Sequence, residues 1–128
     1  MPLAIRNLTR ANTPRLPYRQ LAERILGKRY ELSVTLIGDT RAKTLNRVWR
    51  GKNYPANILT FPLERNLGEI FLNLNQTSGS DLQPLFIHGL LHLKGLTHGS
   101  RMERLENYAQ NYYHRTRRRY HIGQGRSL

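Results

Sequence analysis

The stretch Leu82-Gln-Pro-Leu-Phe-Ile-His88-Gly-Leu-Leu-His92-Leu-Lys-Gly95-Leu-Thr-His98 carries three of the chain's five histidines within eleven residues. Its apolar residues lie on nearly every side, which predicts a helix from about Gln83 that is buried at the centre of the domain. Pro84 suits the first turn of that helix, and Asp81 can cap it. Gly95 is a natural terminator, so the helix is expected to end there.

The spacing of the three histidines indicates a metal site. Residues four apart on a helix share a face, so His88 and His92 can direct both imidazoles at one ion. A turn at Gly95 can bring His98 back as a third ligand. Three neutral nitrogens with one open position describe a catalytic zinc site, whereas a structural zinc usually has four protein ligands. A single histidine here would more often be a core residue bonded to the backbone, but three at this spacing favour a metal.

Four strands and four helices are expected along the chain. Periodicity predicts strands at 3–7, 31–37, 58–61 and 67–72, and helices at 18–28, 40–49, from about 83, and from 100 to about 113. This order predicts an α+β fold, in which a small mixed sheet of about four strands is covered by about four helices. The histidine-bearing helix is expected at its centre, and the order of the strands stays open.

Local signals refine these elements. In the helix at 40–49, the spacing of Ala42, Leu45, Val48 and Trp49 predicts that all four face inward. Pro62 is expected to stop the strand at 58–61. Residues 100–103, Ser-Arg-Met-Glu, form a capping box that opens the last helix. The expected organisation is one domain over residues 1–113, followed by a basic and flexible tail at 114–128.

The composition excludes several classes of protein. The absence of cysteine removes disulfides and thiolate zinc sites, which fits a reducing compartment. No apolar run approaches the roughly 18 to 20 residues that span a bilayer, and residues 1–6 are too short for a signal-peptide core. We therefore expect a soluble, cytoplasmic protein without a membrane partner.

The net charge of +13 is concentrated at the two ends of the chain. Residues 1–30 carry seven Arg or Lys against one acidic residue, and residues 99–128 carry seven Arg against two. Such cationic ends favour a polyanionic partner, because each neutralised phosphate releases counterions. Nucleic acid is the preferred interpretation; a purely solubilising charge and a membrane surface are the alternatives.

Gly89 narrows the chemistry of the predicted site. In the protease motif His-Glu-x-x-His, a glutamate directly after the first histidine acts as general base, and here Gly89 occupies that position. A metallopeptidase is therefore disfavoured. From its size alone, Gly89 is expected to leave the helix surface bare beside the metal, with room for a phosphodiester.

Three segments carry a family resemblance. The histidine motif at 88–98 resembles the signature of the YbeY family of metal-dependent endoribonucleases of ribosomal RNA maturation. The stretch at 45–64, Leu-Asn-Arg-Val-Trp-Arg-Gly-Lys-Asn-Tyr-Pro-Ala-Asn-Ile-Leu-Thr-Phe-Pro-Leu-Glu, resembles its second block, and Leu-Gly-Glu-Ile at 67–70 its third. The resemblance implies one zinc ion on His88, His92 and His98, a single-stranded RNA substrate, and ribosomal particles as partners.

The resemblance also implies a role for Arg50 in catalysis or RNA binding. A guanidinium can clamp two phosphate oxygens and stabilise charge that builds during cleavage. Its neighbours Arg47 and Lys52 are further RNA-binding candidates. In the tail, arginines can bind phosphates; these candidates are Arg115, Arg117, Arg118 and Arg119. A disordered solubilising tail is the alternative.

The chain departs from the family pattern at two carboxylates. Thr97 stands before the last histidine and Asn57 before the strand, where the family usually has aspartate. Glu69 matches an acidic family position, and the segment between Leu72 and His88 is shorter than usual. The leading hypothesis is a zinc-dependent endoribonuclease. The alternative is a ribosome-associated RNA-binding protein whose metal is structural or vestigial.

Overall fold

Four strands form one mixed sheet in the computed structural model, which describes residues 1–77 and 79–95. The strands are β1 (Leu3–Asn7), β2 (Glu31–Ile37), β3 (Ile58–Glu64) and β4 (Leu67–Asn73), in the spatial order β1-β2-β4-β3. β1, β2 and β4 are parallel, whereas β3 pairs antiparallel with β4 and forms one edge of the sheet.

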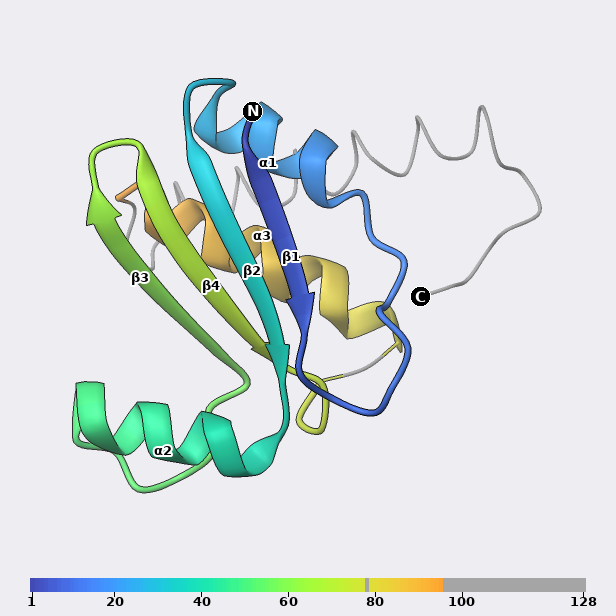
Figure 1. Ribbon diagram of the computed structural model, residues 1–128, viewed down its shortest axis with the longest axis vertical. Coiled ribbons are helices and arrows are strands. Elements are labelled where there is room, and N and C mark those ends of the chain that lie inside the picture. Colours follow the sequence, from blue (N-terminus) through green and yellow to red (C-terminus); the bar gives the residue numbers. More distant parts are fainter. Residues whose placement is uncertain (78, 96–128) are drawn as a thin grey trace.

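Two helices cover one face of this sheet, as Figure 1 shows: α1 (Tyr18–Leu26) and α3 (Leu82–Leu93). A third, α2 (Asp39–Arg50), lies beyond the ends of β3 and β4, at the bottom of that view. A short 3₁₀ helix, η1 (Gly79–Asp81), leads into α3. The α+β prediction is confirmed with these three α-helices in the described part of the chain, and the helix predicted from Ser100 falls outside it.

The core lies between the sheet and the pair α1 and α3. Alternate side chains of the strands point to this face, because successive residues of a strand face opposite sides. One buried cluster contains Leu32, Val34 and Leu36 of β2 together with Phe86, Ile87 and Leu90 of α3, and all six are at most 1% exposed. Each buried side chain of this size contributes about 1.5–3 kcal/mol, so α3 is the central helix, as its composition predicts.

The inward face predicted for α2 is wrong at two positions. Val48 is 63% exposed and Trp49 67% exposed, whereas Ala42 and Asn46 are fully buried. Asn46 can be buried because its side-chain amide donates to the Tyr54 carbonyl at 2.9 Å. The fully buried residues of α2 are therefore small or polar, Leu45 is half-buried, and Val48 and Trp49 lie outside.

The prediction that Pro62 stops the strand at residue 61 is wrong. β3 continues through Pro62 to Glu64. Proline lacks the N–H that a sheet ladder uses, but an edge strand has one side without a partner. β3 is such a strand, and its register shifts only beyond Pro62. The edge position therefore accommodates a residue that would interrupt a central strand.

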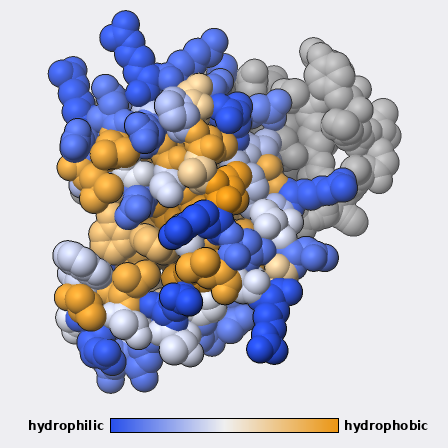
Figure 2. Space-filling model, in the orientation of Figure 1, coloured by the Kyte–Doolittle hydropathy of each residue, from blue (hydrophilic) through white to orange (hydrophobic). Residues whose placement is uncertain are grey.

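An aromatic surface lies on the side of the sheet away from α3. Trp49 contacts Phe61 edge-to-face at 6.2 Å between ring centroids, and Phe61 contacts Phe71 in the same way at 5.7 Å. Apolar side chains gather over β3 and β4 on this side in Figure 2. Within residues 1–77 and 79–95, no helix has the length and apolar character needed to cross a membrane.

Candidate functional site

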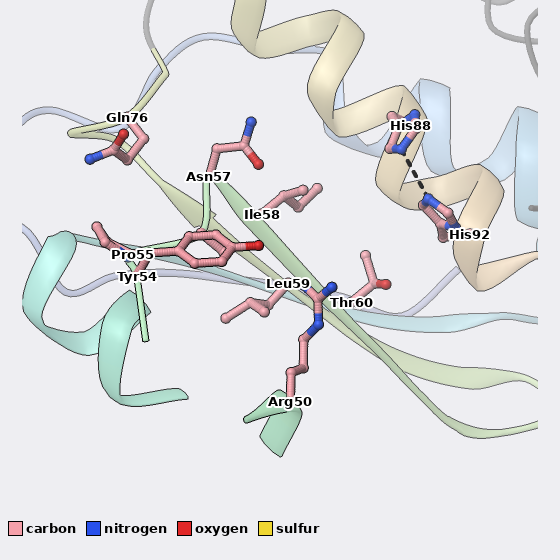
Figure 3. A pocket seen from close by; sticks show the side chains of 11 residues that line it. Arg50, Tyr54, Pro55, Asn57, Ile58, Leu59, Thr60, Gln76, His88 and His92 are labelled. Carbon is pink, nitrogen blue, oxygen red and sulfur yellow. Dashed lines mark hydrogen bonds between the residues drawn. The ribbon is translucent and has the colours of Figure 1, made fainter. Parts of the chain in front are cut away.

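His88 and His92 lie on one face of α3 and point at each other. Their Nε2 atoms are 2.9 Å apart in a hydrogen bond, and their ring centroids are 4.5 Å apart at 76°. One of the two nitrogens therefore carries the proton of this bond, and the other accepts it. The predicted i, i+4 convergence is present: both Nε2 atoms face the same point beside α3 (Figure 3).

The small size of Gly89 predicted an open surface beside these histidines, and this prediction is wrong. Gly89 is buried against the sheet, where an added Cβ would lie 2.6 Å from Ile58 Cδ1 and 3.3 Å from Thr60 Cγ2. Such distances are shorter than ordinary van der Waals contact. The missing side chain lets α3 approach β3 closely, and this approach sets the two histidines beside the sheet edge.

A cavity of about 730 Å³ opens in front of the histidines. It is lined by Arg50, Tyr54, Pro55, Ala56, Asn57, Ile58, Leu59, Thr60, Gln76, His88 and His92. In Figure 3, the histidines lie on one side, Arg50 and Tyr54 on the other, and β3 runs between them. Among the described lining residues only Arg50 carries a permanent charge, so the cavity is suited to an anionic group.

Arg50 reaches the cavity because α2 ends there. Gly51 adopts a left-handed conformation, with φ of 69°; its N–H donates to the Arg47 carbonyl, and the Lys52 N–H donates to the Asn46 carbonyl. A residue with a Cβ rarely adopts this conformation, so Gly51 suits the turn. Arg47 and Lys52, the other predicted RNA-binding residues nearby, are exposed and do not line the cavity.

Two buried asparagines hold the loop that carries Tyr54 and Asn57. Asn46 bonds to the Tyr54 carbonyl, and the Asn73 amide donates to the Ala56 carbonyl at 3.2 Å. The Asn73 backbone N–H bonds to the Asn57 carbonyl at 2.9 Å. Sequence reasoning missed both asparagines, and the position of Asn73 between Leu72 and Leu74 was the only available signal.

Asp39 links this loop network to the cavity wall. Its Oδ1 accepts hydrogen bonds from Asn73 Nδ2 and Gln76 Nε2, both at 2.9 Å. The bonds from Gln76 and then Asn73 lower the pKa of the Asp39 carboxyl, because they stabilise its charged form. Gln76, which lines the cavity, is thereby tied to the start of α2.

Several predicted site residues stay untested. His98, Thr97 and the tail arginines Arg115, Arg117, Arg118 and Arg119 lie outside the described residues. Within residues 1–77 and 79–95 no three His, Asp or Glu side chains are grouped as a metal would require. The proposed third ligand is therefore still a prediction.

Glu69, the acidic residue of the third block, lies away from the site. Its neighbours Gly68 and Ile70 are buried on the α3 face of β4. Since side chains alternate along a strand, Glu69 points to the opposite face of the sheet. It therefore does not replace a carboxylate missing from the cavity.

Comparisons with known proteins agree on one family. The family model described as Endoribonuclease YbeY matches residues 8–117. Endoribonuclease YbeY of Mycoplasma mycoides is 34% identical over 89 residues, covering 53% of this chain and 54% of that protein. The human Endoribonuclease YbeY is 31% identical over 133 residues and covers 80% of each chain.

The fold agrees with a solved structure. A protein of Thermotoga maritima, determined in solution, superposes with a TM-score of 0.60 at 23% identity, covering 98% of this chain and 99% of that one. The chain spans only about half the length of the first relatives it matches, 54% for Mycoplasma mycoides and 44% for Anaeromyxobacter. The family model nevertheless matches most of the sequence, and this chain belongs to the YbeY family.

Proposed function

We propose that this protein is a metal-dependent endoribonuclease that cuts single-stranded RNA. Membership of a family whose relatives bear the name Endoribonuclease supports the nuclease activity. We further propose a Zn²⁺ cofactor, ribosomal RNA as the substrate, and a cytoplasmic role in the maturation and quality control of ribosomal particles. The observation that carries the proposal is the convergence of His88 and His92 in a cavity shared with Arg50.

The histidine pair fits a zinc ion. Neutral imidazole nitrogens bind zinc at about 2.0–2.1 Å, so two of them on one tetrahedral ion stand about 3.3 Å apart. The observed separation of 2.9 Å requires only a slight opening of the pair. His88 and His92 would hold the ion together with His98. When bound, zinc would activate a water molecule and polarise a phosphoryl oxygen.

Arg50 would bind the phosphate that is cut. Its guanidinium has five donors in a planar fork, which matches two oxygens of one phosphate. No described lining residue of the cavity carries a carboxylate that would compete for it. Arg50 would therefore orient the phosphodiester toward the histidines and stabilise the negative charge that grows there during cleavage.

A second candidate is an RNA-binding protein without turnover. It is favoured by Asn57, which lines the cavity where the family usually has aspartate. An amide cannot accept and return a proton at neutral pH, so Asn57 cannot act as a general base. This candidate predicts RNA binding that falls with salt and a metal that only supports structure.

Metal analysis and RNA cleavage separate the two candidates. Protein purified without a histidine tag should contain about one zinc per chain and cut ribosomal RNA, and a chelator should stop the cutting. His92→Ala should lose both bound zinc and cleavage, whereas the exposed α1 variant Gln20→Ala should keep both. Cleavage that persists in His92→Ala would exclude the metal mechanism. Binding with zinc but without cleavage would favour the RNA-binding protein.

A further inference from the structure

Among residues 1–77 and 79–95, no strand pairs with the outer edge of β3, so backbone groups of β3 point away from the sheet there. The bond from the Asn73 N–H to the Asn57 carbonyl makes Asn57 a hydrogen-bonded position of the β3–β4 ladder. Such positions alternate along an antiparallel strand. With Leu59 opposite Phe71 and Thr60 opposite Ile70, Leu59 is the next residue bonded to β4. Ile58 and Thr60 therefore direct their N–H and C=O groups outward, away from the sheet.

The position of Pro62 independently supports this assignment of the outward-facing residues of β3. Pro62 lies two residues after Thr60 and opposite Gly68, so it falls on the same outward-facing set. A proline has no N–H, and β3 continues through it to Glu64. The strand tolerates Pro62 because the outward set contributes no bonds to the ladder.

These outward groups face the candidate site. Ile58, Leu59 and Thr60 line the same cavity as His88, His92 and Arg50. Figure 3 places this part of β3 between the histidines and Arg50. The Ile58 carbonyl and the Thr60 N–H are neighbours on the outward side, since only residue 59 separates them. The wall of the cavity thus offers one acceptor and one donor side by side.

A nucleobase matches such a pair better than a phosphate does. The Watson–Crick edge of every base has a donor next to an acceptor, whereas phosphate oxygens only accept and would meet the Ile58 carbonyl unfavourably. A peptide strand fits less well, because Pro62 removes the next donor that a continued ladder would need. The cavity also contains Tyr54, 51% exposed, whose ring can stack on a base.

We propose that the Ile58 carbonyl and the Thr60 N–H bind the Watson–Crick edge of one unpaired base beside the phosphodiester that Arg50 holds. This inference rests on the proposed RNA substrate. Because all four bases carry a donor next to an acceptor, the contact selects unpaired bases and not a sequence. A base already paired in a duplex has no free edge, so the site accepts single-stranded RNA.

A scan with single abasic nucleotides tests this contact. Removing the base at one position beside the cut should lower kcat/KM on the order of tenfold in the wild type. Thr60→Pro removes the outward N–H, as Pro62 does naturally, and should abolish that abasic penalty because the contact is already lost. Thr60→Val keeps the N–H and removes the hydroxyl, so it should retain the penalty.

Three outcomes overturn the inference or its premise. An equal abasic penalty in the wild type and in Thr60→Pro would exclude the strand edge as the contact. A wild type that cuts RNA without any abasic penalty would exclude a base subsite but leave the proposed function intact. A wild type that neither binds nor cuts RNA would reject the proposed function itself.

A second measurement covers the case in which Thr60→Pro does not fold, as judged by circular dichroism. The wild type is then given RNA with a nonpolar base isostere, which stacks but forms no hydrogen bonds. If this RNA is cut as slowly as the abasic one, hydrogen bonding to the strand edge is supported. If it is cut as fast as normal RNA, stacking on Tyr54 suffices and the proposal is wrong.

Discussion

The carboxylate of Asp39 connects segments that surround the candidate site. Asp39 begins α2, where the helix dipole favours a negative charge, and it accepts bonds from Asn73 and Gln76. Both effects stabilise the ionised carboxylate. Through Asn73 and Gln76 this one charge connects the start of α2 with β4 and with the wall of the cavity.

Asp39→Asn is predicted to remove an acid-sensitive part of the stability. The lowered pKa of Asp39 means that its contribution is complete above the ordinary value of 3.8 and is lost as pH falls through the lower folded value. Wild type should therefore be more stable than Asp39→Asn at pH 7, and the difference should shrink below about pH 4. Urea unfolding followed by circular dichroism from pH 7 to pH 3 measures this.

Asp81→Asn provides the control for that experiment. Asp81 is an exposed carboxylate just before α3 and makes no cap hydrogen bond to it. Its replacement removes a charge beside a helix start without removing a hydrogen-bonded charge, so it isolates the effect of the bonds that Asp39 accepts. If the curves of wild type and Asp39→Asn stay parallel down to pH 3, the bonds from Asn73 and Gln76 do not stabilise the charge.

At the scale of elements, the packing of α3 on β3 decides where the histidines lie. Gly89 is the contact point, since its missing Cβ gives space to Ile58 and Thr60. A larger residue would push α3 away from the strand edge that lines the cavity. The glycine after His88 therefore serves the approach of helix and sheet and does not provide room for the substrate.

Gly89→Leu is predicted to destabilise the fold by roughly 1–3 kcal/mol or more, because overpacking forces neighbours to move. The added side chain would clash first with Ile58. Lys94→Leu adds the same side chain at an exposed position just after α3 and should change stability by less than about 0.5 kcal/mol. Chemical denaturation compares the two. Unchanged or increased stability of Gly89→Leu would mean that this face of α3 is open.

The sequence predicts elements best where one strong pattern decides them. The period of β2 and the apolar composition of α3 each place an element correctly, because burial alone determines them. Prediction from the sequence fails where side-chain hydrogen bonds or the position of a strand in the sheet outweigh the pattern of apolar residues. A side-chain bond buries Asn46 in place of Val48, and an edge position keeps Pro62 inside β3.

In the candidate site, too, local patterns predict some features, and contacts between distant segments decide the others. The spacing of His88 and His92 is sufficient to predict their convergence, since helix geometry fixes it. The contribution of Tyr54 depends on a loop that Asn46 holds across eight residues of sequence, and no periodic pattern encodes such a contact. The outward direction of the Ile58 and Thr60 backbone groups depends on the register of β3 with β4, which the sequences of the two strands do not determine.

Across the whole molecule, the proposed RNA binding would depend on two separate features, the cavity and the charge distributed along the chain. The cavity holds one permanent cation among its described lining residues, enough to orient a single phosphate. The net charge of +13 lies mostly elsewhere in the sequence. In the proposed function, the distributed cations would give affinity that is independent of RNA sequence and sensitive to salt, and the cavity would supply the chemistry.

The tail at 114–128 is predicted to contribute to RNA affinity and not to turnover. Replacing Arg115, Arg117, Arg118 and Arg119 by glutamine should lower the slope of log K against log salt by up to about 3, at about 0.7 for each contact to single-stranded RNA. Fluorescence anisotropy of a labelled RNA between 50 and 200 mM salt, roughly the range in which such contacts weaken, measures this slope. The cleavage rate at saturating RNA should stay the same, because Arg50 and the histidines are unchanged. Deletion of 114–128, which also removes Arg126, should lower the slope at least as much; an unaltered slope in both would identify the tail as solubilising only.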